Sequence, residues 1–549
     1  MPAKRVYLET FGCQMNELDS ELVTGQLAAL GYAFTADSEQ ADIVLYNTCS
    51  VRERAEQKVW SRLGALKDEK SGRPDLVVGV LGCMAERDGT DLMKRMPVVD
   101  VMCGPAELDK LPELLDNAVR TRASLASEPS LAAQRSAKVA ALQGSASRRS
   151  GTLAAAEDRL EMLDLSRAVS PTADDAKRSA YVRITRGCNK FCTYCVVPHT
   201  RGAEIHRPPD HIIDECRKLA DAGVIEITLL GQTVNHYRYE HGSSVIVDGI
   251  TQPQKGRTYK GSHHRDAFAG EHTTTFADLL RRIHDEVPAV QRLRFVTSYP
   301  RDFGDDVLEV IRDHPRLCRY LHVPAQSGSD RILKKMNRGY TIGEYFEFID
   351  RARAFLDQPE IGRPLMLSGD IIVGFPTETD DDFEMTRQML VRSRCKNQFI
   401  FKYSPRPGTV AYDRIPDDVP DQVKRARNNE LLALQAEVSD SISHEQIGRR
   451  FPVFVEGLSR TEMKKRGSDV KPGNGMVGIT VGGRDPAAVA TLELPETGEQ
   501  VQLSGRTDGD LIVFFDAPDG AAAKRMLGQI VDVEVTGADR LSLRGELVK

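Results

Sequence analysis

The feature that most constrains the fold of this chain is a repeated alternation between short β-branched runs and amphipathic helical stretches. Residues 4–122 contain four such runs, and each ends in a cysteine or a glycine: "RVYLETFGC", "ADIVLYNTC", "LVVGVLGC" and "VVDVMCG". Stretches such as "NELDSELVTGQLAALGY" lie between them. This alternation is typical of a parallel sheet covered by helices. We therefore predict a multidomain α/β protein whose first domain, residues 1–122, is a doubly wound parallel sheet.

The same alternation returns at residue 180 and continues to residue 446. Helical patterns separate six candidate strands, which are "AYVRITRG", "IEITLLGQ", "RLRFVTSYP", "RYLHVPAQSGS", "MLSGDIIVGFP" and "QFIFKYSPRPG". Six β/α units amount to three quarters of an eight-unit barrel. We predict a central partial (β/α)6 barrel, interrupted by a polar, glycine-rich inserted loop at 238–275.

Two further segments differ from these domains in composition and hydrophobic pattern. Residues 123–179 are rich in Ala, Ser and Arg and poor in aromatic residues, which predicts a flexible linker. Residues 447–549 carry short strand patterns with turn signals, such as "RFPVFVEG", "LIVFF" and "GQIVDVEVTG". These patterns predict a small OB-like β-barrel with an inserted loop at 460–500.

Length and composition restrict the class of protein. A chain of 549 residues is too long for a single hydrophobic core. No run of 18 apolar residues occurs, and the N-terminus enters a strand pattern at once, so we expect neither a membrane span nor a signal peptide. We expect a cytoplasmic protein, in which ten cysteines indicate metal binding or catalysis rather than disulfides. The net charge of −6 provides no global basic field for nucleic acid.

Three cysteines gather in the stretch "RGCNKFCTYC". Cys188, Cys192 and Cys195 have the spacing C-x3-C-x2-C, with no fourth cysteine or histidine nearby that completes a set of four. Structural zinc takes four protein ligands, usually as two separated pairs, and a catalytic zinc seldom takes three thiolates from one loop. A [4Fe–4S] cluster held by three thiolates leaves one iron free for a small molecule. The loop follows the first barrel strand, so it lies at the mouth where barrel active sites form.

Three more cysteines lie far apart in sequence, but each closes a predicted strand. They are Cys13, Cys49 and Cys83. All carboxyl ends of the strands in a parallel doubly wound sheet lie on one edge, where ligands bind, so these thiols can converge on one object. The alternative is that they are small buried hydrophobic residues.

The chain resembles a known family at these residues. "RGCNKFCTYC" resembles the signature of radical S-adenosylmethionine enzymes, in which the cofactor chelates the open iron and its reduction releases a 5′-deoxyadenosyl radical. The arrangement of Cys13, Cys49 and Cys83 resembles the methylthiotransferases, which carry a second [4Fe–4S] cluster in an N-terminal domain. The resemblance implies two [4Fe–4S] clusters and S-adenosylmethionine as cofactors. It implies that Cys188, Cys192 and Cys195 act in catalysis through the cluster that cleaves this cofactor.

Other strand ends take cofactor-binding roles by the same resemblance. The resemblance implies that Gly231 and Gln232 contact the methionine part of S-adenosylmethionine. It places Gln326 and Ser327 near the ribose of this cofactor, and Gly369 and Gly374 near its adenine. The alternative at each glycine is a turn that only glycine permits. Cys103 closes a fourth strand, and we expect a core residue there, with a ligand role left open. Cys216, Cys318 and Cys395 are expected to be inert.

The C-terminal barrel resembles the TRAM domain, an RNA-binding module of RNA-modifying enzymes. Arg449, Arg450 and Arg506 are candidate RNA-binding residues, and the phenylalanines Phe451, Phe514 and Phe515 mostly fill the barrel in the interpretation we prefer. The domain is close to charge-balanced, so the RNA prediction follows from the resemblance.

Three methylthiotransferase subfamilies are possible. "YNTCSVRERAEQKVWSRLG" and "LHVPAQSGSDRILKKMNRGYT" resemble the one that thiomethylates C2 of N6-prenylated adenosine at position 37, beside the tRNA anticodon. The alternatives modify threonylcarbamoyl adenosine in tRNA or an aspartate of a ribosomal protein. Thr233, the linker and both inserted loops depart from the family pattern.

The resemblance also implies partners. They are tRNA through its anticodon loop, a low-potential electron donor such as flavodoxin or ferredoxin, and a sulfur donor, and we expect a monomer. An alternative of another class is a non-catalytic iron–sulfur protein that binds RNA or senses redox state.

Overall fold

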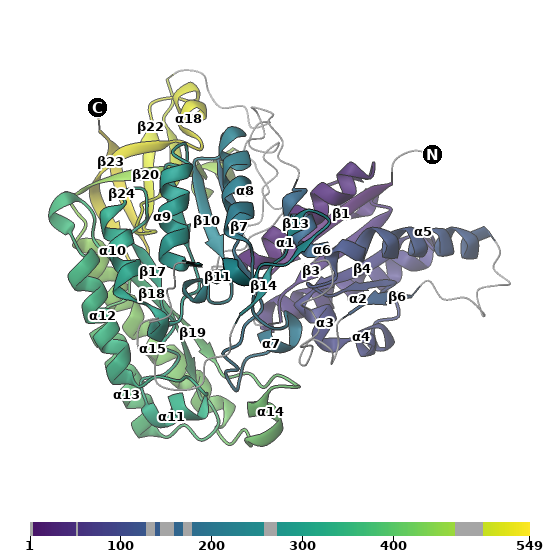
Figure 1. Ribbon diagram of the computed structural model, residues 1–549, viewed down its shortest axis with the longest axis horizontal. Coiled ribbons are helices and arrows are strands. Elements are labelled where there is room, and N and C mark those ends of the chain that lie inside the picture. The colour runs from purple at the N-terminus through teal and green to yellow at the C-terminus, as the bar shows by residue number, and fades with distance from the viewer. Residues whose placement is uncertain are drawn as a thin grey trace.

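The computed structural model describes residues 4–50, 53–127, 138–142, 159–167, 178–256, 272–466 and 498–548. Figure 1 shows three parts: an N-terminal sheet with its helices in purple and blue, a teal and green partial barrel, and a yellow C-terminal barrel. Among the described residues, no helix is long and apolar enough to cross a membrane.

The N-terminal part is one parallel sheet, as predicted. In spatial order its strands are β2 (Ala33–Phe34), β1 (Arg5–Phe11), β3 (Ile43–Thr48), β4 (Val77–Gly82), β5 (Val101–Cys103) and β6 (Val139–Ala141). Its helices are α1 (Gln14–Ala29), α2 (Glu53–Gly72), α3 (Cys83–Asp88), α4 (Thr90–Arg95), α5 (Leu111–Ser127) and α6 (Arg159–Leu165). Each connection returns the chain parallel to the previous strand, so the strand carboxyl ends share one edge.

Alternating side chains of the strands explain why helices cover both faces of this sheet. Ile43 and Leu45 of β3 pack in one core with α1, α5 and α6. Val44 and Tyr46 pack in the opposite core with α2, α3 and α4. Strands buried on both faces have continuous hydrophobic sequences, as "IVLY" does.

The central part is a curved array of six parallel strands, as predicted. They form two sheets, β7 (Ser179–Arg183), β10 (Glu226–Leu230) and β16 (Arg292–Phe295), and then β17 (Tyr320–His322), β18 (Met366–Val373) and β19 (Asn397–Lys402). A parallel bridge between Leu293 and Leu317 joins the two sheets. The array therefore follows the chain order from β7 to β19 as an open barrel.

Helices cover the outer face of this open barrel. They are α8 (Pro209–Asp221), α9 (Phe276–Glu286), α10 (Asp305–Asp313), α11 (Asp330–Lys335), α12 (Ile342–Leu356), α13 (Asp380–Ser393), α14 (Val410–Arg414) and α15 (Asp421–His444), and the short α7 (Val197–Thr200) follows the cysteine loop. Capping boxes at Thr275, Thr341 and Thr379 fix where α9, α12 and α13 begin.

The C-terminal part is a closed five-stranded barrel, as predicted. Around the barrel its strands are β20 (Arg450–Leu458), β21 (Val501–Arg506), β22 (Ile512–Ala517), β24 (Ser542–Leu547) and β23 (Ile530–Asp539), with helices α16 (Arg460–Lys465) and α18 (Gly520–Met526) beside them. Phe451 and Phe515 are buried in its core, so these two aromatic rings fill the barrel.

The structure corrects the prediction of a linker at 123–179 in part. Helix α5 extends to Ser127, β6 pairs with β5, and α6 packs against the N-terminal core through Leu160 and Leu163. These elements were not recognised because they are short: β6 has three residues and α6 has seven. The remaining residues of this interval lie outside the described ranges, and the domain boundaries stay a prediction.

The predicted inserted loop at 238–275 is also partly regular. It contains β11 (Arg238–Glu240), β12 (Ile246–Val247), β13 (Ile250–Thr251), β14 (Gln254–Lys255) and β15 (Thr273–Thr275). Strand β14 pairs antiparallel with β9 (Ile205–His206), which pairs with β8 (Thr185–Arg186) beside the cysteine loop. Of the inserted loop predicted at 460–500, α16 opens the interval and residues 467–497 lie outside the described ranges.

A buried network of charges joins the N-terminal sheet to the barrel. Arg183 of β7 donates hydrogen bonds to Asp19 of α1 at 3.2 Å and to Asp164 of α6 at 2.8 Å. Arg207 donates to Glu161 of α6 at 2.9 Å, and to Glu215 of α8. Burial raises the pKa of Glu161, but the charge of Arg207 outweighs it and brings that pKa to about 2. The buried charges of Arg183 and Arg207 keep these partners only while the N-terminal sheet and the barrel stay docked.

We expect Asp164→Ala to lower the free energy of unfolding by about 3 kcal/mol, because it leaves the buried Arg183 guanidinium with part of its countercharge removed. Urea denaturation followed by tryptophan and far-UV signals measures this change. The matched control is Asp214→Ala, which breaks an exposed pair with Arg217 and should cost about 1 kcal/mol or less. Equal losses for the two variants would contradict a structural role for the network.

Candidate active site: two thiol triads

The three N-terminal cysteines converge at the carboxyl edge of the parallel sheet. Cys13 follows β1 and caps α1, Cys49 follows β3, and Cys83 begins α3 directly after β4. A hydrogen bond with Cys49 is the main cause that lowers the pKa of Cys13 to about 6, against the opposing effect of burial. The Cys13 thiol also lies 3.2 Å from the amide oxygen of Asn16. This triad, named the N-terminal triad below, presents a readily ionised thiol at the sheet edge.

Two glycines permit this convergence. Gly12 has a φ of 143°, and a Cβ atom there would lie 2.4 Å from the Cβ of Cys49. Gly82 has a φ of 85°, and its Cβ would lie 2.4 Å from the side-chain oxygen of Asn47. Both positions need the conformational freedom and the small volume of glycine. The backbones can therefore approach closely enough to bring the thiols together.

The barrel reaches this triad through two residues that the sequence analysis did not select. Arg201 follows α7, and its guanidinium donates to Asp19 at 2.8 Å. Its charge favours the ionised forms of Cys13 and Cys83, and the Thr200 side chain hydrogen-bonds Cys83. Burial nevertheless raises the pKa of Cys83. In Figure 1, α7 lies against α3, which starts at Cys83.

The second triad, named the barrel triad, lies on the loop between β8 and α7. Burial, followed by the nearby charges of Glu204 and Cys192, raises the pKa of Cys188 to about 12. Burial and the charges of Cys192 and Cys188 also raise the pKa of Cys195. Three ionised thiolates this close repel one another unless a cation lies between them. The irons of an iron–sulfur cluster would supply that positive charge. The backbone amide of Lys190 donates to the Cys188 sulfur at 3.5 Å.

Arg338 holds the barrel triad against the next part of the barrel. Its guanidinium donates to the Cys192 sulfur at 3.4 Å and to the Pro324 carbonyl at 2.8 Å, and it stacks 4.6 Å from the Tyr299 ring centroid. Lys190 lies over the same ring at 4.6 Å and pairs with Asp302. Sequence reasoning missed Arg338, because only the fold brings it to the cysteine loop, more than 140 positions earlier.

Two of the predicted cofactor contacts show features of a binding site. Gln326 has a φ of 76°, which is strained for a residue other than glycine, and its buried side-chain oxygen has no hydrogen-bond partner among the described residues. Gly231 follows β10, and a Cβ there would lie 2.2 Å from the Thr185 hydroxyl. Gln232 beside it is half-buried. A strained, buried and unsatisfied carboxamide fits a polar ligand at the barrel mouth.

The other predicted contacts have packing explanations. Ser327 shares a hydrogen bond with Thr386 of α13 at 3.3 Å. A Cβ on Gly369 would lie 2.6 Å from the Gln398 side chain, and one on Gly374 would lie 2.3 Å from Lys424 of α15. Helix packing therefore accounts for Ser327 and Gly374, and packing against the adjacent strand β19 accounts for Gly369. Their cofactor contacts stay predictions.

Sequence reasoning did not predict a row of polar side chains on the face of β17 and β18 that points away from the covering helices. His322 Nδ1 lies 2.8 Å from the Ser368 hydroxyl, and His322 Nε2 lies 3.4 Å from Asp370. Ser368 and Asp370 are two positions apart, so they share one face of β18. Leu367 and Ile371 lie on the other face and pack against the helices. The period-two alternation in "MLSGDIIVG" could have identified this row.

The three candidate RNA-binding arginines do not form one patch. Arg450 is exposed and pairs with Glu534, whereas Arg506 is held between Glu456 and Asp510. Arg506 lies opposite Phe454 of β20. Phe454 is four positions from Arg450, which separates the two arginines by about 13 Å along that strand. Asp510 also binds Arg294 and Lys396 of the partial barrel, so Arg506 lies at the junction between the two barrels.

The remaining cysteines are apart from both triads. Cys103 is buried in the N-terminal core, burial raises its pKa, and its thiol donates to the Glu107 carbonyl at 3.1 Å. Cys216, Cys318 and Cys395 are likewise buried, with pKa values raised by burial. These four thiols have the surroundings of packing residues.

Comparison with known proteins agrees with this division of the chain. Residues 5–104 match the uncharacterized protein family UPF0004, residues 182–390 match the Radical SAM superfamily, and residues 491–548 match the TRAM domain. A tRNA-2-methylthio-N(6)-dimethylallyladenosine synthase of Rhodopirellula baltica is 39% identical over 544 residues, which cover 99% of this chain and 95% of that protein. The same-named protein of Syntrophotalea carbinolica is 36% identical over 546 residues and is covered completely.

The chain belongs to the tRNA-2-methylthio-N(6)-dimethylallyladenosine synthase family. Among solved structures, a radical S-adenosylmethionine methyltransferase from Kitasatospora setae aligns with a TM-score of 0.44 and 14% identity, over 75% of this chain and 77% of that one. Membership of the synthase family confirms the fold class and the family predicted from the cysteine motifs.

The two triads fit the cofactors expected for this family. Each offers three thiol sulfurs from one locality, the donor set of a [4Fe–4S] cluster with one open iron. Cys188, Cys192 and Cys195 would hold one cluster and Cys13, Cys49 and Cys83 the other. The side-chain oxygen of Gln326 is buried and unsatisfied among the described residues, and its contact with S-adenosylmethionine stays a prediction.

We expect Gly12→Ala to remove roughly half of the protein-bound iron, because the new methyl group would separate Cys13 from Cys49 and leave the barrel triad intact. Iron analysis of the anaerobically purified protein, together with Mössbauer spectra, measures the loss. Gly64→Ala is the matched control, since a Cβ there meets nothing within 4 Å. Full iron occupancy in a folded Gly12→Ala protein would contradict the close approach at this edge.

Proposed function

We propose that this chain is a radical S-adenosylmethionine enzyme that adds a methylthio group to C2 of N6-prenylated adenosine at position 37, beside the tRNA anticodon. The observation that carries this proposal is the presence of two separate thiol triads, joined through Thr200 and Arg201 within one chain. Relatives named for this reaction align over 99% of the chain, so all three parts of the protein belong to the match.

The two triads have different tasks in this proposal. Cys188, Cys192 and Cys195 hold the cluster that, with bound S-adenosylmethionine, supplies one-electron cleavage of the cofactor's sulfonium bond. Arg338 keeps the Cys192 sulfur in place and contributes a buried positive charge beside it. Cys13, Cys49 and Cys83 hold the cluster that carries the sulfur to be donated. Separate sites keep the radical-forming group apart from the sulfur until substrate binds.

Cofactor and RNA contacts follow as parts of the same proposal. Gly231, Gln232 and Gln326 bind S-adenosylmethionine at the barrel mouth, with Ser327, Gly369 and Gly374 shaping the strand ends. The C-terminal barrel binds tRNA, and Arg450, whose side chain is largely exposed, is better placed for this than Arg506, which is less exposed and lies between two carboxylates. An unpaired base of the anticodon loop reaches the barrel mouth at a smaller unstacking cost than a base of a duplex.

The proposal also names partners and location. A low-potential donor such as flavodoxin or ferredoxin supplies electrons, and a separate sulfur donor recharges the N-terminal cluster. The enzyme acts as a cytoplasmic monomer. Full-length relatives with the same reaction in their names favour prenylated adenosine over threonylcarbamoyl adenosine or a ribosomal-protein aspartate. They likewise favour an enzyme over an iron–sulfur protein that only binds RNA or senses redox state.

Nucleoside mass spectrometry of tRNA tests the function directly. In cells that lack their own methylthiolase, this gene should produce 2-methylthio-N6-prenyladenosine and consume the unthiolated precursor. Cys188→Ala and Cys49→Ala should each abolish the product, because each removes a ligand of one cluster. Cys216→Ala, which removes a buried thiol outside both triads, is the matched control and should retain activity.

The two cysteine variants should differ in a second assay. Purified Cys188→Ala protein should fail to cleave S-adenosylmethionine under reducing conditions, whereas Cys49→Ala protein should still cleave it. Product formation by Cys49→Ala would contradict the role of the N-terminal triad. Modification of threonylcarbamoyl adenosine or of ribosomal protein, with the prenylated precursor untouched, would reverse the choice of substrate.

A further inference from the structure

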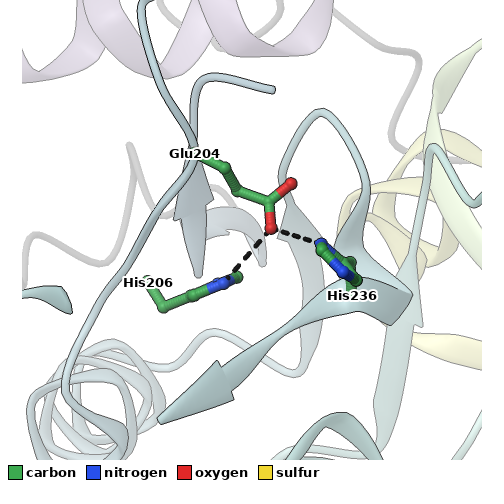
Figure 2. Close-up of side chains that lie close together, drawn as sticks. All are labelled: Glu204, His206 and His236. Carbon is green, nitrogen blue, oxygen red and sulfur yellow. Dashed lines mark hydrogen bonds and ion pairs between the residues drawn. The ribbon is translucent and has the colours of Figure 1, made fainter. Parts of the chain in front are cut away.

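A third cluster of ligating side chains lies beside the barrel triad and has no part in the proposed reaction. It consists of Glu204, which precedes β9, His206 within β9, and His236 in a 3-10 turn (Val234–His236) after β10. Figure 2 shows one carboxylate oxygen of Glu204 lying between the two imidazole rings. Glu204 and His206 are almost completely buried.

The three side chains converge as metal ligands do. One ligating atom from each lies within 4.8 Å of the other two. Glu204 Oε1 is 3.2 Å from His206 Nε2 and is also hydrogen-bonded to His236 Nδ1. The two rings are edge to face, with centroids 6.2 Å apart, so both present nitrogen atoms to the same oxygen. One carboxylate and two imidazoles form the donor set of many zinc sites with three protein ligands.

Two independent observations point to a ligand rather than to a self-contained ion pair. The second carboxylate oxygen of Glu204 and the Nδ1 atom of His206 are buried without hydrogen-bond partners among the described residues. Buried polar atoms are normally satisfied, so the second oxygen of the carboxylate that both imidazoles face indicates a missing partner, whereas His206 Nδ1 is not the ring nitrogen that faces this carboxylate. In addition, Gly256 closes the cluster with its backbone, and a Cβ there would lie 2.7 Å from Glu204 Oε1 and 2.8 Å from His206 Nε2.

The cluster also connects the cysteine loop to the inserted segment. Asn189, next to Cys188, accepts a hydrogen bond from the Glu204 amide at 3.1 Å and donates one to the Gly256 carbonyl at 2.9 Å. The Gly256 amide donates to the Glu204 carbonyl at 2.8 Å. Glu204 also contributes to the raised pKa of Cys188, so its charge acts on the barrel triad. An ion bound here would join β9 to the turn after β10 at the edge of the barrel mouth.

We propose that Glu204, His206 and His236 bind a zinc ion that cross-links β9, which pairs with β8 beside the cysteine loop and with β14 of the inserted segment, to the 3-10 turn from which that segment leaves the barrel. Neutral imidazole and carboxylate donors suit divalent zinc, and water completes a four-coordinate site. No thiol takes part, so this ion is distinct from both iron–sulfur clusters. The zinc site is a structural element of the barrel mouth and does not depend on the identity of the RNA substrate.

A second group, His284, Asp285 and His314, provides the contrast. Asp285 is mostly exposed, and its carboxylate pairs with His284. His314 Nδ1 lies 2.8 Å from the Val310 carbonyl of its own helix. In this group the carboxylate is exposed and both histidines are only partly buried, and His314 serves as the control position.

Elemental analysis of the anaerobically purified holoprotein is the first test. We expect one zinc per chain in addition to the cluster iron, and loss of that zinc in His206→Asn and Glu204→Gln with iron unchanged. His314→Asn should keep the zinc. Zinc absent from the wild type, or zinc lost from His314→Asn and kept in His206→Asn, would overturn the proposal. Loss of iron instead of zinc in the His206 and Glu204 variants would overturn the assignment to zinc.

X-ray absorption at the zinc edge is the second test, because it reads the ligands without relying on a variant that must fold. We expect nitrogen and oxygen neighbours at about 2.0–2.1 Å, with outer-shell scattering from two imidazoles. Sulfur neighbours at about 2.3 Å would mean that zinc occupies cluster cysteines, and this result would overturn the proposal.

Discussion

The arrangement of this protein depends on buried charges that neither of its first two parts can satisfy alone. Arg183 and Arg201 belong to the barrel, and both donate to Asp19 of the N-terminal helix α1. A buried guanidinium without its carboxylate costs several kcal/mol, so the docked arrangement is strongly preferred over a separated one. The same contacts place α7 against α3 and thereby bring the barrel loop to the edge of the N-terminal sheet. Buried charge pairs thus contribute to the relative position of the two thiol triads, beside apolar contacts such as that of Leu230 of β10 with the N-terminal core.

The two triads are embedded in different environments, and the difference matches the proposed division of tasks. The pKa of Cys13 is lowered, chiefly by its hydrogen bond with Cys49 and in part by the charge of Arg201, whereas burial raises the pKa of Cys83. Burial is the main cause that raises the pKa values of Cys188 and Cys195, and the nearby charge of Cys192 adds to it for both, together with that of Glu204 for Cys188. Ionisation of the barrel triad is therefore coupled to the arrival of a cation, which neutralises the repulsion among the thiolates.

Much of the fold could be predicted from sequence, because the strands of a parallel sheet are short continuous hydrophobic runs with glycine or cysteine at their ends. Both cysteine triads could also be identified from the sequence: the barrel triad from its local spacing, and the N-terminal triad from its positions at strand ends. Arg201, Arg338 and Glu204 could not, because their roles arise from neighbours brought together by the fold. Strand β6 was also missed, since "VAA" has low β propensity and is a strand only through its pairing with β5.

The short helix α7 has a consequence for how this chain can vary. Thr200 lies five positions after Cys195, and these few residues join one triad to the residue that hydrogen-bonds a thiol of the other. The short covalent link therefore limits how far Thr200 can lie from the barrel triad, and the charge pairs of Arg183 and Arg201 with Asp19 hold Thr200 against Cys83. Evolution can lengthen segments elsewhere, as between β11 and β15, without altering the path between the centres. An insertion or deletion of even one residue between Cys195 and Arg201 would rotate Thr200 by about 100° around the helix axis and break that path.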